Sequence, residues 1–420
     1  MRYAVTTFGC RVNQADSLQL EAELRGRGAV RATVEEADVV VVNTCSVTAS
    51  ADQGTRQTLR RVARLNPEAQ LLATGCYATR ASTDIEALPG APLVVPNDEK
   101  HTIAARVLGE PDSTTADRYG DGAGACGAPV TPGLVGRVAF MLRVQTGCDQ
   151  PCAYCVIPTT RGRGRSLALS HVGRAVSHAA QGGFHEIVLT GVHLGSFGRD
   201  LEPSSSLIEL LRFLDRHPSN VRFRISSLEP MDCPPALIDL VAASGRFVPH
   251  FHLPLQHASD RILRRMRRPY TLAQYAETVD RIRHLLPDAA IGSDLIAGYP
   301  GESEDDAQRT LDYVAGSPLT YLHVFPYSAR PGTEAVALSG RVAGPIIRAR
   351  AQRLRAVGGQ LAAAFRQRQI GREREAIALD AEGLVLTDNY LKVRVLAGVK
   401  PNSLLRVRID SAEPLTGVVT

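Results

Sequence analysis

Three cysteines near the start of the chain each stand just after a short apolar run, and this spacing constrains the fold more than any other feature. The runs and the cysteines that follow them are Tyr3–Thr7 with Cys10, Val39–Asn43 with Cys45, and Leu71–Thr74 with Cys76. Amphipathic stretches at Gln14–Arg25 and Asp52–Leu65 separate the runs. This alternation predicts a small parallel α/β sheet. Because the carboxyl ends of parallel strands share one rim, we expect the three cysteines to meet there.

A second group of three cysteines lies in one compact loop. Cys148, Cys152 and Cys155 form a CxxxCxxC motif in the run Gly-Cys-Asp-Gln-Pro-Cys-Ala-Tyr-Cys. Three thiolates hold a 4Fe–4S cluster by three irons and leave the fourth iron open, whereas an electron-transfer cluster normally takes four thiolates. The known use of such an open iron is to bind S-adenosylmethionine, whose reductive cleavage gives a 5′-deoxyadenosyl radical. The two groups therefore predict two open 4Fe–4S clusters.

Each group has a simpler alternative. The compact loop could hold structural zinc, but zinc takes a fourth ligand and usually pairs CxxC with a second such pair or with histidines, and none follows here. The dispersed cysteines could be small core residues. Their neighbours are small or polar, and Gly9 and Gly75 allow the backbone to approach a cluster closely. The cluster interpretation is favoured for both groups.

Composition is ordinary for a soluble globular protein. The 420 residues include 44% hydrophobic and 22% charged residues, enough for two or three domains. The sequence has neither a run of about 18 apolar residues nor the apolar region of a signal peptide, so we expect no membrane span and a cytoplasmic location. In that reducing compartment, clustered cysteines are more often metal ligands than disulfides. Isolated Cys126 and Cys233 are left out of both groups.

A second α/β pattern follows a Gly- and Asp-rich linker at 109–136. Six candidate strands are Val138–Val144, Glu186–Thr190, Val221–Ile225, His250–Leu255, Ile291–Ala297 and Tyr321–Pro326. Helical stretches between them predict a partial parallel (β/α)6 barrel with its site at the carboxyl ends of the strands, where the CxxxCxxC motif lies. Residues with suitable chemistry at these ends are the candidate S-adenosylmethionine ligands: Tyr154, Gly191, Ser226, Ser227, Glu229 and Asp294.

The C-terminal part is basic. Residues 341–420 contain 14 Lys and Arg against 7 Asp and Glu, while the whole chain has a net charge of +5. An Arg-rich helix is predicted at Pro345–Gln369, and five short β-like runs follow it, which indicates a small all-β barrel of the oligonucleotide-binding kind. A polyanionic partner is one explanation of this charge, and a solvated basic helix is the other.

Several motifs together resemble the radical S-adenosylmethionine methylthiotransferases over nearly the whole chain. They are Thr-Phe-Gly-Cys-Arg-Val-Asn-Gln, Val-Asn-Thr-Cys-Ser-Val-Thr, Thr-Gly-Cys-Tyr-Ala, the CxxxCxxC run with Val-Ile-Pro-Thr-Thr-Arg-Gly-Arg, Gly298-Tyr-Pro-Gly-Glu and Tyr327-Ser-Ala-Arg-Pro-Gly-Thr. The resemblance implies an α/β fold with three domains: a cluster-binding domain (1–108), a radical SAM domain (137–345) and a TRAM domain (370–420). A linker (109–136) joins the first two domains, and a connecting helix (346–369) joins the last two.

The resemblance also implies a reaction. Sulfur is inserted into a C–H bond and capped as a thiomethyl group. The cluster on Cys148, Cys152 and Cys155 generates the radical, and the cluster on Cys10, Cys45 and Cys76 delivers sulfur. S-adenosylmethionine has two roles, as radical source and as methyl donor. A reduced low-potential electron donor and a sulfur donor are the further partners implied.

Within this family the motifs look most like the branch that acts on N6-threonylcarbamoyladenosine at position 37, in the anticodon loop of tRNA. The alternatives are N6-isopentenyladenosine of tRNA and an aspartate of a ribosomal protein, while a protein of another class would bind tRNA with purely structural cysteines. A basic barrel suits tRNA phosphates better than a protein target. Candidate RNA-binding residues are Arg161, Arg163, Arg165, Lys392, Arg394, Arg406 and Arg408. His257-Ala258 stands where the family commonly has Ser-Gly.

Overall fold

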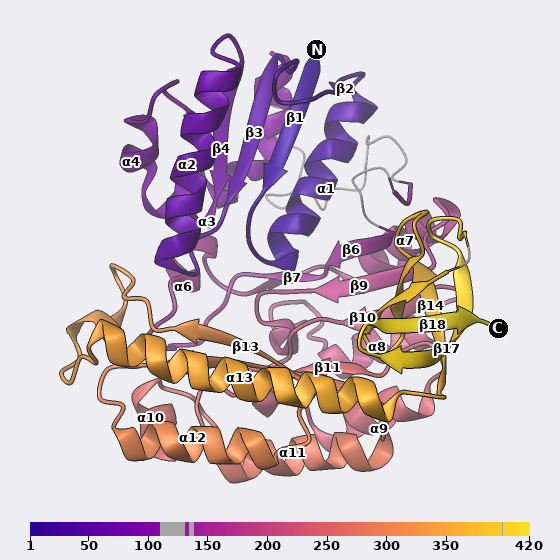
Figure 1. Ribbon diagram of the computed structural model, residues 1–420. Coiled ribbons are helices and arrows are strands. Elements are labelled where there is room, and N and C mark those ends of the chain that lie inside the picture. The colour runs from indigo at the N-terminus through magenta and orange to yellow at the C-terminus, as the bar shows by residue number, and fades with distance from the viewer. Residues whose placement is uncertain (110–130, 134–137, 397) are drawn as a thin grey trace.

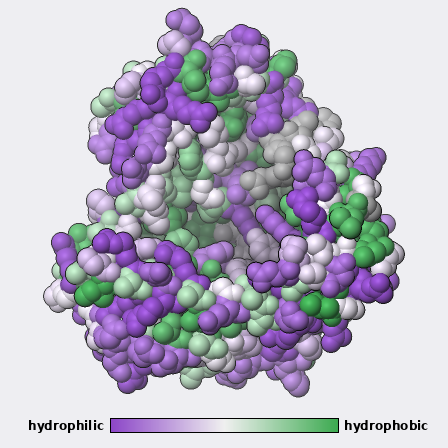
Figure 2. Space-filling model, viewed as in Figure 1, coloured by the Kyte–Doolittle hydropathy of each residue, from purple (hydrophilic) through white to green (hydrophobic). Residues whose placement is uncertain are grey.

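The computed structural model describes residues 1–109, 131–133, 138–396 and 398–420. Three bodies are visible in Figure 1: an N-terminal α/β sheet domain, a larger α/β barrel below it, and a small β-barrel at one side. The space-filling view in Figure 2 shows a hollow bordered by all three. Cys126 and nearly all of the predicted linker lie outside the described residues. No helix of the described part is long and apolar enough to cross a membrane.

The N-terminal domain is a five-stranded parallel sheet in the order β2-β1-β3-β4-β5. Its elements are β1 (Arg2–Thr7), α1 (Arg11–Gly26), β2 (Val30–Arg31), β3 (Val39–Thr44), α2 (Ala49–Leu65), β4 (Gln70–Gly75), α3 (Cys76–Arg80), α4 (Ser82–Glu86), β5 (Leu93–Val95), the 3₁₀ helix η1 (Asn97–Thr102) and α5 (Ile103–Leu108).

Both faces of this sheet are buried, which explains the unbroken valine run of β3. Val40 and Val42 pack towards α2, and Val39 and Val41 pack towards α1 and α5, because successive side chains of a strand point to opposite faces. Strand order 2-1-3-4-5 reverses direction between β1 and β3, and ligands of such sheets bind at the carboxyl ends next to that reversal. The topology therefore places the ends of β1, β3 and β4 side by side.

The barrel consists of two three-stranded parallel sheets, β10-β9-β6 and β11-β12-β13, joined by a bridge between Ser227 and His252. The strands are β6 (Ala139–Arg143), β9 (Glu186–Thr190), β10 (Arg222–Ile225), β11 (His250–His252), β12 (Ala290–Ala297) and β13 (Tyr321–Pro326). Helices α6 (Ile157–Arg161), α7 (Leu169–Gln181), α8 (Leu207–Asp215), α9 (Pro235–Ala243), α10 (Asp260–Arg265), α11 (Leu272–Leu285) and α12 (Glu304–Gly316) connect them. Short pieces are β7 (Gln145–Thr146), β8 (Arg165–Ser166), η2 (Leu194–Ser196), η3 (Pro230–Asp232) and η4 (Glu334–Ala337).

The C-terminal part begins with α13 (Gly344–Arg368), which crosses the barrel along β13 and α12 in Figure 1. A closed five-stranded barrel follows, in the order β14-β15-β16-β18-β17. Its strands are β14 (Glu373–Ala378), β15 (Leu384–Thr387), β16 (Lys392–Val395), β17 (Leu404–Ala412) and β18 (Leu415–Val419). A closed barrel of this size fits a TRAM-like domain, and the predicted α/β fold class with a small β-barrel is confirmed.

Element boundaries differ from the predictions at a few places. The short edge strands β2 and β5 were not expected from the sequence, and β11 ends at His252 instead of Leu255. Pro254 has no N–H to donate, and Gln256 has a positive φ of 66°, so the chain leaves regular strand geometry there.

A buried carboxylate, Asp16 of α1, joins the N-terminal domain to the barrel. Its oxygens accept from Lys100 of its own domain at 2.7 Å and from Arg161 of the barrel at 3.0 Å, and Arg143 forms a third ion pair. The Asp16 side chain is 3% exposed. Burial acts to raise its pKa, but the three cations outweigh burial and hold the pKa of Asp16 well below its ordinary value.

A second buried carboxylate, Asp52 of α2, makes a similar connection on the other side of the sheet. It accepts from Arg80 at 2.7 Å and from Arg330, in the loop after β13, at 2.6 Å. Ser46 donates to its other oxygen at 2.9 Å. The two connections fix the carboxyl edge of the N-terminal sheet against the barrel.

The small β-barrel is attached through the turn between β15 and β16. The Arg224 guanidinium, on β10, donates to the carbonyls of Thr387 and Asp388 and pairs with Glu186. Tyr390 stacks on His250 with ring centroids 4.2 Å apart. The Tyr390 hydroxyl accepts a hydrogen bond at 2.9 Å from Arg11, the residue that follows Cys10 in the chain. All three bodies thus meet at Tyr390.

Replacing Asp16 with asparagine tests the first connection. Asp16→Asn leaves three cations together without their counter-charge, and removal of one partner of a buried ion pair costs about 3–5 kcal/mol. We expect the midpoint of the first urea-unfolding transition to move to a markedly lower urea concentration.

The matched control is Asp38→Asn, since Asp38 forms an exposed ion pair with Arg2 in the same domain. Solvent screens an exposed pair, so its loss changes stability little. Equal shifts in the two variants would contradict the assigned importance of Asp16.

Candidate functional site

The dispersed cysteines meet at the carboxyl edge of the N-terminal sheet, as the strand ends predict. Cys10 precedes α1, Cys45 follows β3, and Cys76 is the first residue of α3. Gly9 has a φ of 89°, and a Cβ there would lie 2.5 Å from the Cys45 Sγ. Only glycine combines this backbone geometry with such close contact to a thiol.

The surroundings of these thiols are unequal. Burial, with smaller contributions from Cys10 and Cys76, raises the pKa of the Cys45 thiol to about 12. Burial also acts to raise the pKa of Cys76, but Arg161 and Lys100 outweigh it, and its pKa falls below the ordinary value. Cys10 is exposed. The cations that hold Asp16 therefore also favour a thiolate at Cys76.

The compact triad is held by its backbone. The pair β7–β8 closes the base of the loop, and the Cys148 N–H donates to the Gly162 carbonyl at 3.0 Å. The Ala153 N–H donates to Met266 at 3.1 Å. Burial raises the pKa of Cys155 to about 12, with added repulsion from Cys152 and Cys148. The three thiols thus lie close together, beneath a loop fixed at both ends.

Arg268 links the compact triad to a predicted S-adenosylmethionine ligand. Its guanidinium donates to the Cys152 Sγ at 3.1 Å and forms an ion pair with Glu229. Because the Arg268 side chain is only 2% exposed, its charge acts on Cys152 with little screening. Arg268 was not singled out from the sequence.

Asn97 connects the two triads. Its amide donates to the Thr160 carbonyl, five residues after Cys155, at 2.8 Å, and contacts the Cys76 Sγ at 3.7 Å. Cys76 therefore lies at the interface between the N-terminal domain and the barrel, next to the segment that follows the compact triad. Two sets of three converging thiols, each with nearby N–H donors, fit the open 4Fe–4S clusters that the sequence predicts.

The predicted S-adenosylmethionine ligands occupy different positions. The Ser226 hydroxyl is buried and has no hydrogen-bond partner among the described residues, as expected of a group that meets a bound molecule. A Cβ at Gly191 would lie 3.1 Å from Gln145. The Tyr154 ring packs edge-on to Tyr299, in a small core with Met266. These assignments stay predictions.

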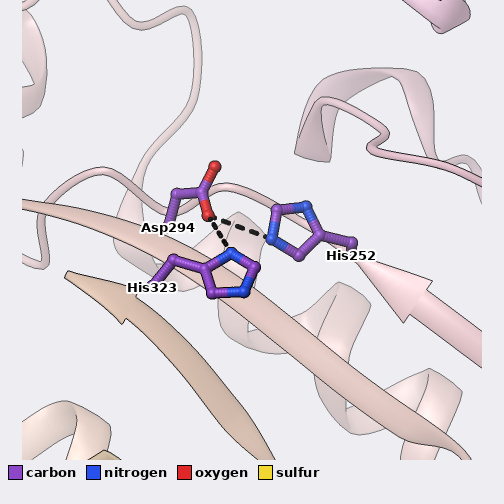
Figure 3. A group of neighbouring side chains, drawn as sticks. All are labelled: His252, Asp294 and His323. Atoms are coloured by element: carbon purple, nitrogen blue, oxygen red, sulfur yellow. Dashed lines mark hydrogen bonds and ion pairs between the residues drawn. The ribbon is translucent and has the colours of Figure 1, made fainter. Parts of the chain in front are cut away.

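Two other predicted ligands already have partners. The Ser227 hydroxyl hydrogen-bonds the Nδ1 of His252 at 2.7 Å. Asp294 lies between His252 and His323, with its Oδ1 3.0 Å from a nitrogen of each (Figure 3). These histidines were not recognised from the sequence, because they lie on different strands.

The arginines after the CxxxCxxC motif border a cavity of about 830 Å³, which also includes Asp149, His193 and Arg199 in its lining. The Arg163 side chain is 93% exposed and lies 3.3 Å from Asp149. Arg165, on β8, is half-buried. Phosphate binding by Arg163 and Arg165 stays a prediction.

Arg161 is more buried than the other two arginines, and phosphate binding by Arg161 also stays a prediction. Its side chain is 3% exposed, and its guanidinium is held by Asp16 and Asn13. Arg161 therefore joins the domains in this structure, although it also belongs to the lining of the same cavity. The sequence could not reveal this, since Asp16 lies 145 residues away.

The four residues of the small barrel that are predicted to bind RNA all point outward. Lys392 and Arg394 alternate with buried Val393 and Val395 on β16, as the period of a strand requires. Arg406 and Arg408 lie likewise on β17, on the other side of β18. Their exposure is compatible with the RNA contact predicted for them.

His257, where the family commonly has serine, is buried beside Thr310, with its Nε2 3.7 Å from Glu302. The Glu302 carboxylate accepts from the backbone N–H groups of Gly298 and Tyr299. His257 therefore supports the turn after β12.

Comparisons with known proteins agree with this arrangement. Residues 2–95 match the family model "Uncharacterized protein family UPF0004", and residues 142–314 match "Radical SAM superfamily". The "Threonylcarbamoyladenosine tRNA methylthiotransferase MtaB" of Bacillus subtilis is 34% identical, over 93% of this chain and 89% of the relative. That of Aquifex aeolicus is also 34% identical, over 97% and 100%. The "tRNA-2-methylthio-N(6)-dimethylallyladenosine synthase" of Acidothermus cellulolyticus is 34% identical, over 98% and 84%.

Among solved structures, the radical S-adenosylmethionine methyltransferase TsrM from Kitasatospora setae has a TM-score of 0.57 at 16% identity, over 80% of this chain and 77% of that chain. This likeness supports the fold.

A substitution at Gly9 tests the geometry of the dispersed triad. Gly9→Ala places a methyl group against the Cys45 Sγ, so we expect the reconstituted protein to fall from about 8 to about 4 irons per chain. Gly28→Ala is the matched control, because Gly28 also has a positive φ, of 82°, but no atom within 4 Å of its added Cβ. Full iron content in Gly9→Ala, or equal loss in both variants, would contradict this packing.

Proposed function

The chain belongs to the radical S-adenosylmethionine methylthiotransferases, and from this premise we propose that it converts N6-threonylcarbamoyladenosine at position 37 of tRNA to its 2-methylthio derivative. The observation that carries the proposal is the meeting of two cysteine triads at one domain interface. A radical SAM enzyme with a single role needs only the compact triad. The second triad supplies what sulfur insertion requires in addition.

We assign different roles to the two sets of residues. Cys148, Cys152 and Cys155 hold the cluster that binds S-adenosylmethionine, and Cys10, Cys45 and Cys76 hold the second. When bound, these groups would supply the radical derived from S-adenosylmethionine, the sulfur and, from a second S-adenosylmethionine, the methyl group. Arg268 contacts both Cys152 and Glu229 and so fixes their relative position, while the Ser226 hydroxyl offers an unpaired hydrogen-bonding group.

The unequal exposure of the second triad supports this division. Cys76 is buried beside Lys100 and Arg161, which both pair with Asp16, while Cys10 is exposed. We therefore propose that substrate approaches the second site from the side of Cys10.

The tRNA substrate rests on the named relatives, and the choice of adenosine rests on finer sequence likeness. Relatives named for threonylcarbamoyladenosine and for dimethylallyladenosine reach the same 34% identity. The segments around Cys10, Cys148 and Ser226 favour the first. N6-isopentenyladenosine and a ribosomal protein aspartate are the alternatives within this family. A non-catalytic tRNA-binding protein with structural cysteines is the alternative of another class.

We further propose contact of the small barrel with tRNA through Lys392, Arg394, Arg406 and Arg408, because neutralised phosphates supply most non-specific affinity. A reduced low-potential electron donor, a sulfur donor and a cytoplasmic location complete the proposal. They follow from the reaction, which consumes electrons and sulfur and acts on tRNA.

The substrate is tested by mass spectrometry of tRNA nucleosides. A strain lacking this gene is expected to lose 2-methylthio-N6-threonylcarbamoyladenosine, keep the unthiolated nucleoside, and retain thiomethylated isopentenyladenosine. Complementation with the wild-type gene is the control. Unchanged thiomethylated threonylcarbamoyladenosine in the deletion strain would overturn the choice of substrate.

The division of roles is tested by substituting each triad separately in anaerobically reconstituted protein. Cys152→Ala is expected to abolish formation of 5′-deoxyadenosine from S-adenosylmethionine. Cys45→Ala is expected to retain this cleavage and to stop thiolation of tRNA, with iron falling to about 4 per chain in each variant. Loss of cleavage in both variants would count against separate roles.

A further inference from the structure

A group of metal-ligating side chains lies inside the barrel, apart from both cysteine triads. His252 ends β11, Asp294 lies on β12 and His323 on β13, so three neighbouring parallel strands each supply one residue. Each residue offers one ligand atom, and these three atoms lie within 4.8 Å of one another. They are the His252 Nε2, a carboxylate oxygen of Asp294 and a nitrogen of His323. Figure 3 shows both rings turned towards the carboxylate.

The His252 ring is oriented by a hydrogen bond to the ring nitrogen that faces away from Asp294, as metal-binding imidazoles usually are. Ser227 hydrogen-bonds the Nδ1 at 2.7 Å, which leaves the Nε2 directed at Asp294. The ring also stacks on Tyr321, with planes 22° apart. A partner on the far nitrogen fixes the tautomer and the direction of the other, as in known metal sites.

The buried Nε2 of His252 lies close to a carboxylate oxygen but forms no hydrogen bond with it. It lies 3.0 Å from the Asp294 Oδ1, but it makes no hydrogen bond of acceptable angle to any described residue. A hydrogen-bonded histidine–aspartate pair aligns its N–H with the oxygen. The observed approach instead fits two atoms that face a common third position.

The exposure of the three side chains suits a bound cation. The side chains of His252 and Asp294 are 11% and 24% exposed, and that of His323 is 56% exposed. The site is therefore mostly enclosed and open at His323.

We propose that His252, Asp294 and His323 bind one divalent metal ion, with zinc as the preferred ion. Two imidazoles and one carboxylate are a donor set typical of zinc sites that keep a fourth position for an outside ligand. This assignment takes Asp294 away from the S-adenosylmethionine ligands predicted from the sequence. Zinc has no redox chemistry, so the ion holds or polarises an oxygen without competing for electrons with the clusters.

The open position gives the ion a role in choosing the substrate, and this step rests on the proposed function. The threonylcarbamoyl group carries a carboxylate and carbonyl oxygens, whereas an isopentenyl group offers no oxygen to a metal. An ion in the barrel lumen therefore favours the first substrate over the second. Sites built to bind a polar group discriminate strongly against analogues that lack it.

The test uses the holoenzyme with both clusters, because free cysteines also bind zinc. The protein is dialysed to equilibrium against zinc without tRNA, and bound zinc is measured by mass spectrometry together with zinc-edge X-ray absorption. The wild type is expected to hold about one zinc ion per chain with nitrogen and oxygen neighbours. Asp294→Ala and His323→Ala are expected to lose most of it at unchanged iron content.

His284→Ala is the matched control, since His284 is an exposed histidine near the end of α11, and it is expected to retain the zinc ion. Absence of zinc from the wild type, sulfur neighbours in the absorption spectrum, or undiminished zinc in Asp294→Ala would overturn the proposal. Because tRNA is absent, these outcomes do not depend on which adenosine the enzyme modifies. Discrimination is measured separately, by comparing affinity for N6-threonylcarbamoyladenosine with and without zinc; equal affinity would overturn the role in substrate choice alone.

Discussion

The ion-pair cluster around Asp16 determines how the parts of this molecule are placed. One buried carboxylate neutralises Lys100 of its own domain and Arg143 and Arg161 of the barrel. Such a cluster tolerates little displacement, since each buried charge depends on the others. Two of its cations also act on Cys76. The same charges therefore join the domains and tune a cysteine of the second triad.

Asp52, on α2, makes the second connection between the N-terminal domain and the barrel. Because α1 follows Cys10 and α2 follows Cys45, each connection starts near a proposed cluster ligand. Cys76 and the segment after the compact triad then lie at one interface, which fits the proposed reaction in two stages on one substrate. Proximity of this kind replaces an encounter between separate species with a step inside one complex.

Local sequence patterns could predict the elements and the meeting of the candidate ligands, but not the partners of these residues across the chain. Periodicity and the position of each cysteine after an apolar run located the sheet, the barrel strands and both triads. Arg161 stands in a run of exposed-looking arginines, and only the approach of Asp16 from another domain reveals its burial. His252, Asp294 and His323 likewise meet through strand order, and Tyr390 joins three bodies through a turn. Such contacts depend on tertiary packing, which no local pattern records.

Two clusters bound at the proposed sites would lie close together across this interface, and electron paramagnetic resonance of the fully reduced holoenzyme detects such proximity. Two reduced clusters at one interface interact magnetically, so we expect spin–spin broadening in the wild type that disappears in variants lacking either triad. A wild-type spectrum equal to the sum of the two single-cluster spectra would contradict the proposed proximity of the clusters.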